Sequence, residues 1–243
     1  MKTTRVKGDR ADISRDQLEG IDGSRLVVVA GLFGSGKTET AINYSLWFAE
    51  KGESVTLVDL DVVTTYLRTR EVRESLTERG VRVVTPSPEG DLDLPAITAE
   101  MWGVMEKPDG RVVVDLGGSA PGARAMGQFS LTLRRAGYSM YLVLNPYRPF
   151  TTNVEGMMEA RKEIAASSRL EISALVSNPH LMGETTLEIV EEGHLLVEEA
   201  ARRMGLPIAF LCLAADLMKE GLEERFGLPI LPMRRYMLAP WEA

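Results

Sequence analysis

The chain has 243 residues, 44% of them hydrophobic, and its 28 Lys and Arg residues against 35 Asp and Glu residues give a formal net charge of −7. This length and hydrophobic content suit one large α/β domain, and the negative balance argues against bulk electrostatic binding to nucleic acid or to an anionic membrane. A single cysteine excludes an internal disulfide and a paired-cysteine metal site, and no apolar run reaches the ~18 residues of a membrane-spanning helix, so we expect a soluble, cytoplasmic protein.

Residues 1–24 are rich in Lys, Arg, Asp and Gly and show no apolar periodicity, which predicts a polar N-terminal extension. The apolar run 25–30 that follows is typical of a buried parallel strand. It leads into the loop 31–38, GLFGSGKT, which is a complete G-x-x-x-x-G-K-[ST] phosphate-binding motif. Apolar residues then recur at helical spacing up to Gly52, so the motif lies between a strand and a helix, where its chemistry requires it.

Each residue type in this loop has a chemical role. Its glycines allow successive backbone N–H groups to face a phosphate, the Lys37 ammonium can reach the β- and γ-phosphates, and the Thr38 hydroxyl can ligate Mg²⁺. The predicted nucleotide-binding residues of the loop are Gly31, Phe33, Gly34, Ser35, Gly36, Lys37, Thr38 and Glu39. The alternative, a glycine-rich turn that binds nothing, is weakened by the strand and the helix on either side.

Strand and helix patterns alternate along the rest of the chain. Short Val, Leu and Ile runs predict strands at residues 54–59, 81–84, 111–115, 138–144, 171–177, 207–213 and 228–231. Segments of helical length lie between them, including residues 92–106, 123–136, 151–168 and 185–204. This alternation predicts a three-layer α/β fold, with a mostly parallel central sheet flanked by helices, as one nucleotide-binding domain over residues 25–232. Residues 233–243 are expected to form a C-terminal tail that packs on the domain.

Two of the predicted strands end in acidic residues. The run 54–61 ends in Asp59 and Asp61, whose side chains point to the same side if the strand continues that far. The run 111–115 ends in Asp115 followed by glycines, as expected of a Walker B carboxylate near Mg²⁺. Carboxylates at the ends of apolar strands are costly unless a cation or water meets them. Beside the phosphate loop they favour a metal site over the alternative of turn or N-cap residues.

With these motifs, the chain resembles the MinD/ParA/CobQ-type P-loop ATPases of the SIMIBI class over residues 26–230. The resemblance rests on the phosphate loop and on LVDLD at 57–61, VVDLGG at 113–118, YLVLNP at 141–146, SALVSN at 173–178 and the segment 205–216. It implies a P-loop NTPase fold with ATP and Mg²⁺ as cofactors.

Carried over position by position, the resemblance also assigns roles. The implied catalytic residues are Lys37 and Asp61, the implied metal site comprises Thr38, Asp59 and Asp115, and Asn178 and Asp216 are implied to contact the purine. Within the metal site, Asp115 would hold the metal's waters and Asp59 would lie one shell further out. Asp61 would orient the attacking water.

The chain departs from the family at Leu32, which stands in place of a second lysine in the phosphate loop. In the family that lysine acts across a dimer interface on the neighbour's nucleotide. Its absence implies slow hydrolysis, unless a partner or the arginines of the segment 68–73 supply the cation. A homodimer stays compatible with the resemblance.

The expected function is that of a Mg-ATP-binding ATPase, a slow nucleotide switch that binds ATP and ADP and acts on an unidentified protein partner. We expect adenine rather than guanine, because SNPH at residues 177–180 stands where a guanine-specific [NT]-K-x-D motif would lie. Two alternatives stay open: an ATP-dependent ligase or kinase of small-molecule metabolism, and a nucleotide-responsive binding module without turnover.

Overall fold

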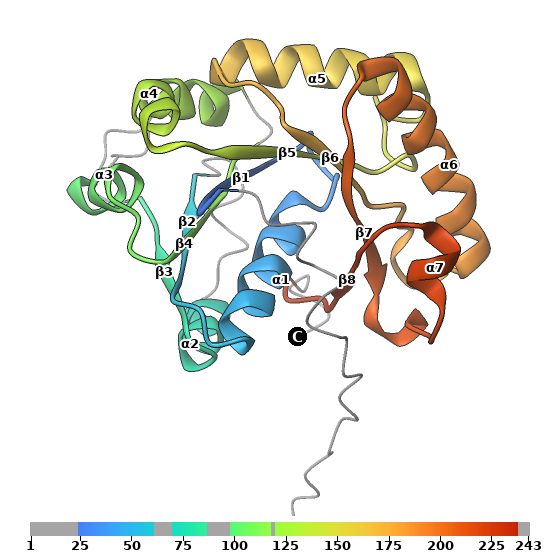
Figure 1. Cartoon of the computed structure of the whole chain (residues 1–243), viewed down its shortest axis with the longest axis horizontal. Coiled ribbons are helices and arrows are strands. Elements are labelled where there is room, and N and C mark those ends of the chain that lie inside the picture. Colours follow the sequence, from blue (N-terminus) through green and yellow to red (C-terminus); the bar gives the residue numbers. More distant parts are fainter. Residues whose placement is uncertain (1–23, 61–69, 87–97, 118–119, 238–243) are drawn as a thin grey trace, which may run out of the picture.

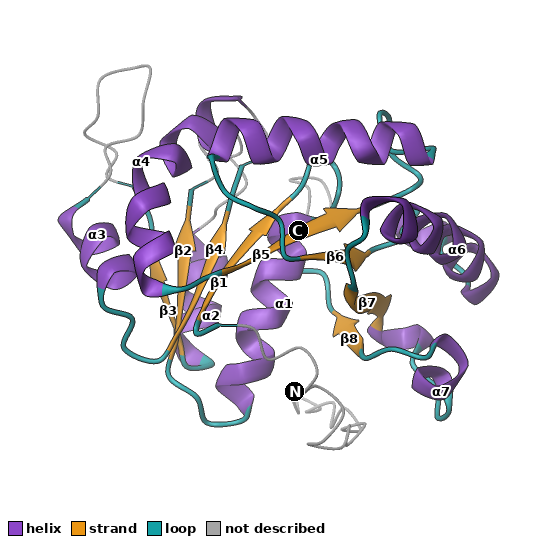
Figure 2. Cartoon of the chain, turned by 45° about the horizontal axis from the view of Figure 1, so that its top comes forward, coloured by secondary structure: helices purple, strands orange, loops and turns teal. Residues whose placement is uncertain are grey.

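The computed structural model describes residues 24–60, 70–86, 98–117 and 120–237, with side chains at all of these positions except 70–71 and 120–125. Within these ranges the chain forms a sheet of eight parallel strands in the order β3-β2-β4-β1-β5-β6-β7-β8 (Figures 1 and 2). The strands are β1 Leu26–Ala30, β2 Val55–Asp59, β3 Val81–Val84, β4 Arg111–Asp115, β5 Ser139–Leu144, β6 Ala174–Ser177, β7 Ile208–Ala214 and β8 Ile230–Met233.

The central strands are apolar on both faces because helices cover both faces of the sheet. In β1, Leu26 and Val28 belong to one hydrophobic core, and Val27 and Val29 belong to the other. All four side chains are fully buried. A strand in this position reads as a continuous apolar run rather than as an alternating one, which is why the run 25–30 predicted it.

Helices complete the outer two layers. Those in the described ranges are α1 Lys37–Glu50, α2 Arg70–Glu78, α3 Ala99–Glu106, α4 Ala120–Ala136, α5 Val154–Ser168, α6 Leu187–Met204 and α7 Leu222–Phe226, with short 3₁₀ turns at Met182–Glu184 and Ala215–Leu217. Helices α3 to α6 bury side chains in one core, and α1 and α2 pack on the opposite face of the sheet (Figure 1). This arrangement confirms the predicted three-layer α/β fold.

The structure moves some of the predicted boundaries. Strand β6 begins at Ala174, three residues later than predicted, whereas the other strands lie within two residues of their predicted bounds. Helix α5 begins at Val154 rather than at Thr151, because the Asn153 side chain accepts a hydrogen bond from the Gly156 amide (2.8 Å) and caps the helix there. The predicted helix 92–106 is described from Ala99 onward, and residues 92–97 lie outside the described ranges.

The chain leaves β8 and continues along α1. Residues 234–237 pack against this helix, and residues 238–243 lie outside the described ranges. Among the described helices, none combines the length and the apolar character needed to cross a membrane.

Candidate functional site

The predicted phosphate loop connects the carboxyl end of β1 to the N-terminus of α1, which begins at Lys37. Gly34 and Gly36 within it have φ angles of 79° and 88°, in the left-handed region that residues with a side chain rarely adopt. These two glycines let the backbone curl at the start of a helix of 14 residues. Unpaired N–H groups and the positive end of the helix dipole favour an anion at such a point.

Gly31, at the start of the loop, has no room for a side chain. A Cβ atom there would lie 2.3 Å from Ser35 Oγ and 2.9 Å from the Val143 carbonyl oxygen. Val143 belongs to β5, which pairs with β1. The close approach therefore holds the beginning of the loop against the sheet.

Asn178, directly after β6, supports the loop from another side. Its Nδ2 donates a hydrogen bond to the Ser35 carbonyl oxygen (2.7 Å), and both residues are buried. A Cβ atom on Gly36 would lie only 2.3 Å from the same nitrogen. One amide hydrogen of Asn178 thus anchors the phosphate loop, and its contact with a purine stays a prediction.

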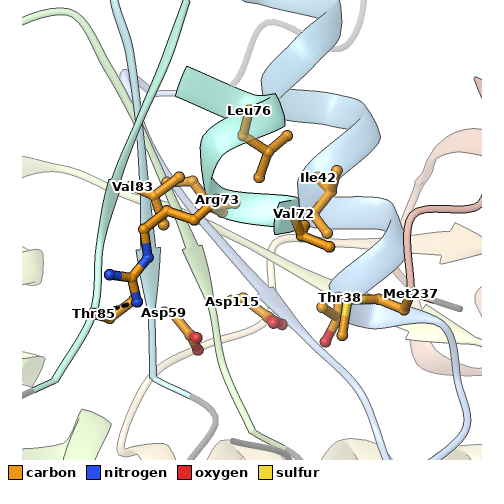
Figure 3. Close-up of a pocket in the computed structure, with 11 residues that line it drawn as sticks. Thr38, Ile42, Asp59, Val72, Arg73, Leu76, Val83, Thr85, Asp115 and Met237 are labelled. Atoms are coloured by element: carbon orange, nitrogen blue, oxygen red, sulfur yellow. Dashed lines mark hydrogen bonds between the residues drawn. The ribbon is translucent and has the colours of Figure 1, made fainter. Parts of the chain in front are cut away.

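Asp59 and Asp115 end the neighbouring strands β2 and β4 and lie opposite each other in the strand register. They are only 5% and 3% exposed. Together with Thr38, the second residue of α1, they line one pocket (Figure 3). Carboxylate and hydroxyl oxygens are the ligands that Mg²⁺ takes, and a cation would offset the cost of burying two carboxylates side by side. The fold therefore brings together the three residues predicted at the metal, and their donor set fits Mg²⁺.

The pocket continues from these oxygens to a largely apolar wall. Side chains from α1, α2, β2, β3 and the C-terminal segment form this wall: Ile42, Leu57, Val72, Leu76, Val83 and Met237. At one side Arg73 donates a hydrogen bond from Nη2 to Thr85 Oγ1 (3.3 Å), and both residues line the same pocket (Figure 3). A second group bound here would lie beside the predicted metal site.

The other predicted loop residues have different surroundings. The Lys37 side chain is buried at the start of α1. Phe33, in contrast, is 80% exposed, so its ring contributes little to the packing of the loop. Asp61, predicted to orient water, lies outside the described residues.

Asp216 lies in the 3₁₀ turn after β7 and is exposed. It is close enough to His180 for its negative charge to raise the pKa of the imidazole, although burial and the positive charges of Arg148 and Arg235 have the larger combined effect and lower that pKa. His180, Arg148, Arg235 and Asp216 thus form one electrostatic cluster. Of these side chains, Asp216 is the one that the resemblance implies at the purine.

Glu39, predicted to bind the nucleotide, turns its carboxylate toward the C-terminal segment. It accepts hydrogen bonds from the backbone amides of Tyr236 (3.0 Å) and Met237 (2.7 Å). Burial raises the pKa of Glu39, and the two hydrogen bonds lower it by less. One turn further along α1, Asn43 accepts a hydrogen bond from the Arg234 amide and donates one to the Arg234 carbonyl oxygen, both at 2.8 Å.

The sequence predicts a tail that packs on the domain, but not that residues 234–237 contact α1. The residues involved are nearly two hundred positions apart in the chain, and acidic or amide side chains on a helix carry no signal of a distant partner. The Glu39 carboxylate is hydrogen-bonded to the C-terminal segment, and a role for Glu39 in nucleotide binding stays a prediction.

Comparisons with known proteins identify the class of fold rather than a close relative. No family model matches the chain. No curated protein matches it either. Solved structures do match, and they share the α/β fold of this chain, which confirms the predicted fold.

Two of the matching structures are FtsY proteins. Chloroplast FtsY from Physcomitrella patens is 15% identical over 82% of this chain, with a TM-score of 0.51, and the signal recognition particle receptor FtsY from Elizabethkingia anophelis is 17% identical over 84%, with a TM-score of 0.50. This chain covers 62% and 65% of those structures. Such identities establish a shared fold, and they do not place the chain in the MinD/ParA/CobQ branch.

Proposed function

We propose that this protein binds a Mg-nucleoside triphosphate, with ATP as the preferred nucleotide, and hydrolyses it slowly as a switch that acts on a protein partner. The observation that carries the proposal is the convergence at the start of α1. Lys37 of the phosphate loop is the first residue of this helix, and Thr38 shares a pocket with Asp59 and Asp115. Loop amides and an ammonium can compensate a triphosphate, and the three oxygen donors can hold Mg²⁺ directly or through water.

The individual roles follow from charge and position. Lys37 would offset phosphate charge at the point where α1 begins, and Thr38 and Asp115 would hold the cation that bridges the phosphates. Asp61 is proposed, on the resemblance, to orient the attacking water. The choice of adenine rests on the resemblance and on the absence of a guanine-specific motif at residues 177–180. Competition binding tests the preference for adenine. Displacement of ATP by GTP at equal concentration would overturn this preference.

Calorimetric titration of Mg-ATP tests the proposal directly. The wild-type protein is expected to bind with micromolar or tighter affinity, and Lys37→Ala is expected to abolish binding because it removes a buried cation from the loop. Lys162→Ala is a matched control, since that ammonium lies on α5 with its side chain 70% exposed. Equal affinities in the wild type and Lys37→Ala would refute the assignment of the loop.

Measurements of ATP binding and phosphate release distinguish the proposed roles of Asp61 and Asp115. Asp61→Asn should leave ATP binding intact and slow phosphate release, whereas Asp115→Asn should weaken the Mg²⁺ dependence of binding itself. A low rate of phosphate release that does not rise with protein concentration is expected of an isolated slow site. A rate that climbs with concentration would indicate activation by a homodimer instead.

A second candidate is an ATP-dependent ligase or kinase that acts on a small molecule. The observation in its favour is the pocket, which extends from the two acids to Arg73, Thr85 and an apolar wall. An acceptor bound there would lie beside the metal, with Arg73 available for an acidic group. A burst of phosphate release that depends on an added metabolite would favour this function. Nucleotide-dependent binding of a protein partner without any turnover would favour a binding module.

A further inference from the structure

Arg148 lies against the phosphate loop although it comes from a different part of the chain. It belongs to the connection between β5 and α5. A Cβ atom placed on Gly34 would lie 3.4 Å from Arg148 Cδ and 3.7 Å from Arg148 Nε. The aliphatic part of the arginine therefore packs across the α-carbon of Gly34, and its guanidinium is carried to the rim of the loop.

The backbone around Arg148 is held by hydrogen bonds that close a tight turn. The Arg148 amide donates to the Asn145 carbonyl oxygen (3.2 Å), and the Arg148 carbonyl oxygen accepts from the Thr151 amide (3.1 Å). The Thr151 hydroxyl also donates to the Asn145 carbonyl oxygen (2.7 Å). The Asn145 side chain in turn bonds backbone on both sides: its Oδ1 accepts from the Tyr147 amide, and its Nδ2 donates to the His180 carbonyl oxygen. The backbone position of Arg148 is thus set without a ligand.

The guanidinium brings a buried donor and a positive charge to this point. Its Nε is buried and has no hydrogen-bond partner among the described residues. A buried donor without a partner destabilises the folded protein, so its retention here needs a reason. The charge also acts locally, since it lowers the pKa of His180. Arg235 and Asp216 also act on that imidazole, so these three side chains bring two positive charges and one negative charge to it.

We infer that Arg148 contacts the phosphate chain of the bound nucleotide and acts there as a second cation beside Lys37. The inference rests on the proposed nucleotide binding and names a further residue of that same site. An arginine fork suits phosphate oxygens because it can donate two parallel hydrogen bonds. The close packing on Gly34 directs it to phosphates that lie along the loop. Leu32 leaves the loop with Lys37 as its sole cationic side chain, and Arg148 adds a second from the same molecule.

The test compares Arg148→Met with Arg148→Lys by calorimetry, using Mg-ATP, Mg-ADP and adenosine as probes. Methionine keeps an aliphatic stem against Gly34 and removes the charge and the donors, whereas lysine keeps the charge. Arg148→Met is expected to weaken ATP and ADP binding ~10- to ~100-fold, the range for a lost hydrogen bond to a charged group. Adenosine binding should not change. Arg148→Lys should restore part of the loss. Arg135→Met, at an exposed position on α4, is the matched control.

Two further measurements distinguish a phosphate contact from a structural role. Loss of a charged contact should make the Kd for ATP less dependent on salt, and the melting temperature without nucleotide should stay close to that of the wild type. Arg148→Met that binds like the wild type, or that loses ATP and adenosine equally while melting earlier, would overturn the inference. If neither the wild type nor Lys37→Ala binds nucleotide, the proposed function itself fails. If Lys37→Ala abolishes binding and Arg148→Met does not affect it, only the role of Arg148 is wrong.

Discussion

The hydrogen bond from Asn178 Nδ2 to the Ser35 carbonyl oxygen gives a prediction that needs no nucleotide. Both residues are buried and the bond is 2.7 Å long, so Asn178→Ala leaves a buried carbonyl without its donor. That loss costs about 1–3 kcal/mol of unfolding free energy. A change of 1 kcal/mol lowers the melting temperature by about 2–4 °C in a chain of this size. Thermal unfolding of the nucleotide-free protein should therefore show a decrease of about 2–12 °C.

Gly36→Ala provides the sharper test of the same contact. The new Cβ would lie 2.3 Å from Asn178 Nδ2, and the φ angle of +88° adds a backbone cost. Gly52→Ala measures that backbone cost alone, because its φ is +87° and no atom lies within 4 Å of the new Cβ. Gly36→Ala should be more destabilising than Gly52→Ala by urea unfolding. The excess should shrink in an Asn178→Ala background, where the obstructing amide is gone. Equal costs for the two glycines, or strictly additive effects, would refute this geometry.

Three other predictions follow from buried groups. Burial raises the pKa of Glu39 from its ordinary value of 4.5, so the folded protein binds this proton more tightly than the unfolded chain does, and stability falls as pH rises through the raised pKa. In urea unfolding, Glu39→Gln should show a smaller fall in stability between pH ~4 and pH ~7. An unchanged dependence of stability on pH would contradict this prediction. Burial raises the pKa of the Cys212 thiol to about 12, so iodoacetamide should modify it slowly at neutral pH until urea unfolds the chain. Gly31→Ala should weaken ATP binding at least ~10-fold in calorimetry, because its methyl would lie 2.9 Å from the Val143 carbonyl oxygen and displace the loop; wild-type affinity would show that the loop accommodates it.

The fold could be predicted because buried parallel strands carry a strong local signal. Helices cover both faces of the sheet, so β1 (LVVVA) and the three central valines of β4 (RVVVD) are apolar without alternation. Helix ends carried less signal. The start of α5 depends on the side chain of Asn153. The short helix α7 is held by Leu222, which belongs to a hydrophobic cluster with residues of β7 and β8. Local propensity does not reveal such contacts.

The candidate site was predictable where one motif or one strand end contains the chemistry. Lys37 and Thr38 belong to the loop motif, and the carboxyl ends of parallel strands meet at one edge of a sheet. The pairing of Asp59 with Asp115 follows from β2 and β4 being neighbours, which the sequence does not state. Arg148 and the segment 234–237 reach the site through tertiary packing alone. No spacing in the chain links either of them to the phosphate loop.

The structure gives a packing role to Leu32, which stands where the resemblance leads one to expect a lysine. In the MinD/ParA/CobQ-type ATPases that the sequence resembles, a second lysine stands here, and its absence removes a source of positive charge for the proposed hydrolysis. In the structure the Leu32 side chain is partly buried and packs against the hydrophobic core that contains Leu142 and Leu144 of β5. A lysine at this position would have to give up that packing or carry its charge out of the core, both at a cost in free energy. The Leu32 side chain therefore helps to hold the loop against the hydrophobic core of the sheet. Under the proposed function, any further cation for the phosphates comes from another segment, and the connection after β5 already brings Arg148 to Gly34.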